Sequence, residues 1–187
     1  MTIGGSSLLI NPPVGSHIVY PYTDGDRVVD AVTLFAAEGL RKGDAVVLVI
    51  TDPHCKKVLK NLERQHLDVN SLKKSDRLIC ADATELLSSF MVDNSPDETL
   101  FNNVIGPILD RAQASIAGKR DNSVRAFGEM VSLLLGGNTP AALKLEELWN
   151  EIVKARSMCL LCTYCLEGKN IASLPDSLVN AHSHFMA

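Results

Sequence analysis

The chain has 187 residues, a length that suits a single domain built around one hydrophobic core. Hydrophobic residues make up 46% of the chain and charged residues 21%, a balance that is typical of folded domains and argues against wholesale disorder. The formal net charge of −4 argues against a protein that binds nucleic acid or an anionic membrane surface through its charge.

Residues 1–15 contain no basic region and only a four-residue apolar stretch, so they do not have the pattern of a signal peptide. They are rich in Gly, Ser and Pro, and we expect a flexible arm that precedes a single domain over residues 16–187. No stretch reaches the roughly 20 apolar residues of a membrane span. With five cysteines, an odd number, the sequence predicts a cytoplasmic protein with reduced thiols.

Five short segments have the composition of β-strands and are bounded by polar or turn residues. They are residues 17–22 (HIVYPY), 44–51 (DAVVLVIT), 76–81 (DRLICA), 123–127 (SVRAF) and 158–164 (MCLLCTY). The second is a continuous apolar run, which is typical of a strand that is buried on both faces.

Apolar residues recur at helical spacing between these strands and predict helices over residues 28–40, 53–62, 100–116 and 139–152, the last with Thr139 and Pro140 as its start signal. Pro53 suits the first position of its helix, with Asp52 as the expected cap. In the third helix the apolar stripe comprises Leu100, Val104, Ile108, Ala112 and Ile116. A last helix is expected over residues 176–185.

Strands that alternate with helices of this length require crossover connections. Such connections produce a mainly parallel sheet with helices on both faces, so the expected fold class is α/β with three layers. Ligands bind to such sheets beyond the carboxyl ends of the strands. These ends are expected at residues 22–25, 51–52, 81–82, 128–130 and 164–165.

The first strand-to-helix turn, YTDGDR (22–27), has neither the glycine-rich loop nor the lysine that binds nucleotide phosphates. Asp24 and Asp26 would repel a triphosphate. Two interpretations stay open, because the turn suits a capped helix entry and also allows Tyr22 and Asp24 to face a small ligand.

Glu129 follows the predicted strand in FGEM (127–130). A carboxylate at the carboxyl end of a strand can serve as a general base or a magnesium ligand. The same residue can instead begin the apolar helix that follows, where a negative charge complements the helix dipole. The sequence favours neither interpretation.

Cys159, Cys162 and Cys165 have the spacing C-x2-C-x2-C, which suggests an iron–sulfur or zinc site. In a buried strand, however, side chains alternate between faces, so Cys162 would point away from Cys159. We therefore predict core cysteines and no metal. Two surface histidines, His182 and His184, are also expected to bind none, because residues two apart share no helical face.

Cys55 follows Pro53 in the first turn of a predicted helix. The N-terminus of a helix lowers the pKa of a thiol, so Cys55 is the best candidate for a reactive cysteine in the chain. An inert thiol remains the alternative.

Five segments in chain order resemble the MEDS domain, a methanogen and methylotroph sensory domain. They are HIVYPYTDGD (17–26), EGLRKGDAVVLV (38–49), DRLICADATELL (76–87), VRAFGEMVSLLLGGNTPAALKLEELWN (124–150) and LLCTYCLEG (160–168). The resemblance covers most of residues 16–168, and GEM followed by LEELWN is its most specific part.

The resemblance implies a fold similar to that of the KaiC and RecA ATPases, with a degenerate phosphate loop. It implies a non-catalytic sensory domain without a cofactor, which binds a small one-carbon or hydrocarbon-derived ligand. The signal would pass by contact to a kinase or a transcription regulator, or within a homo-oligomer. The matching positions give a candidate ligand pocket, which consists of His17, Tyr22, Asp24, Glu129, Trp149 and Tyr164.

Two other functions remain as alternatives. One is a nucleotide-binding ATPase of the same fold with an unusual loop, against which the missing lysine argues. The other is a metal or redox sensor built from cysteines and histidines, against which strand alternation argues.

Overall fold

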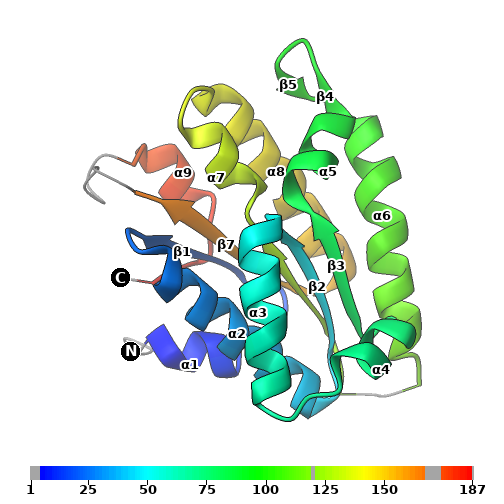
Figure 1. Ribbon diagram of the computed structural model, residues 1–187. Helices are drawn as coiled ribbons and strands as arrows, with labels where there is room; N and C mark the ends of the chain where they lie inside the picture. Colours follow the sequence, from blue (N-terminus) through cyan, green and yellow to red (C-terminus); the bar gives the residue numbers. More distant parts are fainter. Residues whose placement is uncertain (1–4, 119–120, 167–173, 187) are drawn as a thin grey trace.

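Six parallel strands form the centre of the structure, and helices cover both faces of the sheet (Figure 1). The computed structural model describes residues 5–118, 121–166 and 174–186. The strand order is β3-β2-β6-β7-β1-β8. This confirms the α/β fold class with three layers. The strands are β1 (His17–Tyr22), β2 (Ala45–Ile50), β3 (Leu78–Asp82), β6 (Val124–Gly128), β7 (Cys159–Cys165) and β8 (His184–Phe185).

The two helical layers bury different sets of residues against the sheet. One layer contains α1 (Gly5–Ile10), α2 (Gly25–Lys42), α3 (Asp52–Arg64) and α4 (Val69–Lys74). The other contains α5 (Ala83–Phe90), α6 (Glu98–Ser115), α7 (Met130–Leu135), α8 (Thr139–Arg156) and α9 (Asp176–Asn180). A short antiparallel pair, β4 (Met91–Val92) and β5 (Ser95–Pro96), forms a separate two-stranded sheet.

All five predicted strands are present, the first with the predicted bounds and the others with ends shifted by one or two residues. The predicted stripe of α6 was correct at Ala112 and Ile116, which are buried, and wrong by one position at Leu100, Val104 and Ile108. Its buried residues are Phe101, Ile105, Leu109 and Ala112, whereas Leu100 is exposed. Both sets follow helical spacing, and only the rotation of the helix against the sheet distinguishes them.

The ends of the chain and the start of α3 also differ from expectation. Residues 5–10 of the expected arm form α1, which buries Leu8 and Leu9. The last helix ends at Asn180 and is followed by β8, which pairs with β1. The N-cap of α3 is Thr51, not Asp52, and its side chain does not cap the helix.

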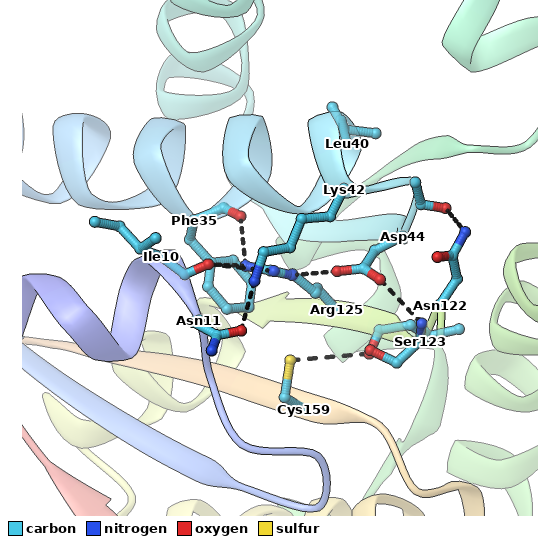
Figure 2. Close-up of polar contacts among 12 residues, drawn as sticks. Ile10, Asn11, Phe35, Leu40, Lys42, Asp44, Asn122, Ser123, Arg125 and Cys159 are labelled. Atoms are coloured by element: carbon cyan, nitrogen blue, oxygen red, sulfur yellow. Dashed lines mark hydrogen bonds and ion pairs between the residues drawn. The ribbon is translucent and has the colours of Figure 1, made fainter. Parts of the chain in front are cut away.

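Arg125 on β6 is a buried cation that fastens α1 to the sheet (Figure 2). Its Nε donates to Asp44 Oδ2 at 2.7 Å, and its Nη1 donates to the carbonyl oxygens of Leu9, Ile10 and Phe35. A Cβ atom on Gly39 would lie 2.6 Å from Arg125 Cδ, so α2 can approach this closely only with a glycine there.

Among the described residues, no helix combines the length and the apolar character that crossing a membrane requires.

Candidate functional site

Four potential metal-ligating side chains converge between the sheet and α8. They come from the start of β1 (His17), the middle of β7 (Cys162), α8 (Glu146) and the segment after α9 (His182). One ligand atom from each lies within 4.8 Å of all the others. The side chains of His17, Glu146 and His182 are at most 2% exposed, and Cys162 is fully buried.

The contacts within this cluster are short. His17 Nε2 lies 3.2 Å from both Cys162 Sγ and Glu146 Oε2. His182 Nε2 lies 3.4 Å from Glu146 Oε1, and the Tyr164 hydroxyl donates to the same oxygen at 2.5 Å. Glu146 is therefore the centre of the cluster.

Burial alone would raise the pKa of Glu146, but hydrogen bonds from His17 and His182, together with their charges, lower that pKa to about 2. The carboxylate is thus ionised at neutral pH. Burial and the charge of Glu146 both raise the pKa of the Tyr164 hydroxyl, which stays protonated and donates its hydrogen.

Trp149 lies in the same layer, one helical turn after Glu146, and is 1% exposed. Its ring packs edge-to-face on Phe101, with the ring centroids 5.3 Å apart. Its indole N–H finds no acceptor among the described residues. The residue is part of the core, as its position in the stripe with Leu145, Leu148 and Ile152 indicates.

A second group of polar side chains lies at the carboxyl end of the sheet. Glu129 directly follows β6 and is 2% exposed. Its Oε2 accepts from both the backbone N–H and the hydroxyl of Thr51, and its Oε1 lies 2.5 Å from His54 Nδ1. Glu129 makes no side-chain cap for α7. Its carboxylate instead fastens the start of α3 to the end of β6.

Tyr22 and Asp24 lie near this edge but differ in their surroundings. Tyr22 ends β1 and is buried, and burial and then the charge of Glu129 raise the pKa of its hydroxyl. Asp24 is exposed and is the N-cap of α2, where its carboxylate accepts from the backbone N–H of Asp26. A carboxylate therefore occupies the turn in which a phosphate-binding loop would present backbone N–H groups.

A hollow of about 120 Å³ opens at the carboxyl ends of β2 and β3. It is lined by Ile50, Asp52, Cys55, Cys80, Ala81 and Asp82. Its two acidic side chains already have partners, because Asp52 pairs with Lys56 and Asp82 caps α5. The two thiols and the aliphatic side chains are therefore the groups available to a ligand.

Cys55 is expected to be an unusually reactive thiol. A hydrogen bond from Cys80 is the main cause that lowers the pKa of Cys55, against the opposing effect of burial, to about 7. The rate of alkylation by iodoacetamide should thus rise steeply between about pH 6 and pH 8 and then level off. Peptide mapping by mass spectrometry identifies the modified cysteine.

Cys80→Ala removes the hydrogen-bond donor and is the control. In this variant the midpoint of the alkylation profile of Cys55 should move up toward about 8.5, the ordinary value for a thiol. An unchanged midpoint would show that Cys80 does not activate Cys55.

The six residues of the predicted pocket do not form one site. His17, Tyr164 and Trp149 lie in the layer of α8, whereas Tyr22, Asp24 and Glu129 lie toward the carboxyl end of the sheet. The expectation of two surface histidines was wrong for His182, whose side chain is fully buried.

Three important residues were missed because their partners are distant in sequence. The sequence patterns did not single out Glu146 or His54, and they predicted Cys162 only as a core cysteine. Strand alternation correctly separated Cys162 from Cys159, which packs in the opposite layer. The alternation of side chains did not indicate which residues contact Cys162 on its side of the sheet.

The family model of the MEDS domain, described as the methanogen/methylotroph, DcmR sensory domain, matches residues 16–181. The match includes nearly all of both groups, from His17 to Glu146 and Tyr164, and ends just before His182. Glu167 and Gly168, at the end of the last resembling segment, lie outside the described residues. No curated protein matches the chain.

Proposed function

Because the chain belongs to the MEDS family of sensory domains, we propose that it is a non-catalytic receptor for a small organic molecule. The ligand binds at the carboxyl end of the sheet, in the hollow between β2 and β3, and the signal passes by contact to another protein. Such a partner is a signalling protein, for example a kinase or a transcription regulator.

The observation that carries this proposal is the size and position of the hollow. At about 120 Å³ it is smaller than the roughly 300–1,000 Å³ of pockets for drug-sized ligands. An apolar cavity of about 150 Å³ holds a molecule the size of benzene. The volume therefore suits a one-carbon or short hydrocarbon-derived compound.

The position of the hollow also suits a sensor. One wall is the start of α3, which Glu129 holds against β6 through Thr51 and His54. A ligand that displaces Asp52 or Cys55 would shift the first turn of α3 relative to the sheet. The exposed face of this helix would then transmit the change to a partner.

The proposal is tested by a screen of small alcohols, amines, carboxylates and halogenated alkanes, monitored through the backbone amide signals of the labelled protein. We expect one class of compound to shift the signals of Ile50, Cys80 and Ala81. Ala81→Leu fills the hollow and should abolish these shifts. Ala114→Leu, on the exposed face of α6, is the matched control and should leave them unchanged.

Two outcomes would contradict the proposal. The first is a screen in which no compound shifts the signals of the hollow. The second is a set of shifts that survives in Ala81→Leu, because binding would then take place elsewhere.

A further inference from the structure

We propose that His17, Glu146, Cys162 and His182 bind a divalent transition metal ion, of which Zn²⁺ is the best fit. The site lies in the layer of α8, on the opposite face of the sheet from the hollow. It goes beyond the proposed function, and neither proposal depends on the other.

The four ligand atoms, which all lie within 4.8 Å of one another, are spaced slightly more widely than in a tetrahedral site. Zn²⁺ with bonds of about 2.0–2.3 Å holds its ligand atoms roughly 3.3–3.8 Å apart. In the cluster, His17 Nε2 lies 3.2 Å from Cys162 Sγ, and Cys162 Sγ lies 3.9 Å from Glu146 Oε2. His182 Nε2 lies 3.4 Å from the other carboxylate oxygen. Small side-chain adjustments would bring all four to one ion.

Both imidazole rings are oriented as metal ligands by their other nitrogen. His182 Nδ1 donates to the carbonyl oxygen of Leu178 at 2.8 Å. His17 Nδ1 donates to Asn150 Oδ1 at 3.0 Å, and the Asn150 amide is itself oriented by its donation to the carbonyl oxygen of Ala181. In each ring Nε2 is therefore the atom that faces the cluster, and it would bind the ion once it gives up the hydrogen that it shares with Glu146, an arrangement that is usual for histidines bound to metals.

The charges of the cluster favour an ion of charge +2. The Nε2 atoms of His17 and His182 each face an oxygen of Glu146, at 3.2 Å and 3.4 Å, in contacts where a Zn²⁺ ion would take the place of the shared hydrogen. A Zn²⁺ ion would bind these atoms and displace the proton of the Cys162 thiol. With one thiolate, one carboxylate and two neutral imidazoles, the buried site would then have no net charge.

The site would join parts of the chain that are distant in sequence. His182 belongs to the segment after α9, which is held to the start of β1 by hydrogen bonds between Ser183 and His17. The metal would thus fasten this segment to β1, β7 and α8 at a single point.

The experiment uses the full chain, unfolded in denaturant with a reductant and refolded with Co²⁺ as a spectroscopic substitute for Zn²⁺. We expect one Co²⁺ per chain, with the intense visible bands of tetrahedral Co²⁺ and a thiolate charge-transfer band in the near ultraviolet. Added Zn²⁺ should bleach both. A weak octahedral spectrum, or a metal content far below one per chain, would overturn the proposal.

Variants with matched controls identify the ligands. Cys162→Ser should lose the charge-transfer band, whereas Cys159→Ser, on the same strand but the opposite face, should keep it. His182→Ala should weaken binding by at least roughly 100-fold, whereas His184→Ala should have no effect. If a variant and its control lost the charge-transfer band or the metal affinity to the same extent, the assignment of that residue as a ligand would be overturned.

Asn150→Ala keeps all four ligands and tests the orientation of His17. We expect a loss of affinity of roughly 10–100-fold with the tetrahedral spectrum retained. Circular dichroism shows which variants fold. If Cys162→Ser does not fold, the metal affinities of His182→Ala and Asn150→Ala still decide whether the site exists. Wild-type affinity in both of these variants would refute the site.

Discussion

Replacing Arg125 by methionine is expected to lower the free energy of unfolding by about 3–5 kcal/mol, because it leaves a buried charge without its partner. Asp44 is 5% exposed, and the guanidinium of Arg125 is its only ion-pair partner among the described residues. The carbonyl oxygen of Ile10 loses its donor as well (Figure 2), and so does that of Leu9. Urea unfolding followed by circular dichroism measures the effect.

Arg111→Met is the matched control for this experiment. Arg111 pairs with Asp76 at the surface, and its side chain is 59% exposed. Exposed pairs contribute roughly 0–1 kcal/mol, so this variant should unfold nearly as the wild type does. A loss of less than about 1 kcal/mol for Arg125→Met would contradict the view that the buried pair holds α1 in place.

Trp149→Ala should cost about 3–5 kcal/mol, the usual cost of removing a large aromatic side chain from a core. The ring is 1% exposed and packs on Phe101. Its cavity would open between α8, α6 and the sheet. Because Trp149 is the only tryptophan, unfolding must be followed by circular dichroism and not by intrinsic fluorescence.

Trp149→Phe separates packing from hydrogen bonding. Phenylalanine keeps most of the buried area, and it removes an indole N–H that has no acceptor among the described residues. We expect it to recover most of the stability that alanine loses. A Trp149→Ala variant with unchanged stability and a lost response to a ligand would instead place the indole in a binding site.

The fold could be predicted because its signals are local. The apolar run at residues 45–50 is typical of a strand buried on both faces, and Pro53 marks the start of the next helix. Local patterns could not show which face of a helix is buried where two faces are equally apolar. In α6, residues 100, 104 and 108 follow the same spacing as residues 101, 105 and 109, so the wrong stripe was chosen.

The candidate sites could be predicted only in part. His17 and Tyr164 came from the resemblance, but Glu146, which brings them together, projects from α8 and shows no signal of its own in the sequence. His182 and His17 are 165 positions apart in the sequence, and their rings are in contact because β8, which follows His182, pairs with β1. For the same reason, Cys80 was not recognised as the hydrogen-bond partner of Cys55.

The order of the strands has a consequence for folding during synthesis. Strand β1 is made first, yet its partners in the sheet, β7 and β8, are made last. A growing chain can assemble β2, β3 and β6 while β1 still has both edges exposed. The sheet is complete only after β8 has left the ribosome, so β1 is the strand most exposed to chaperones and to wrong pairing in the nascent chain.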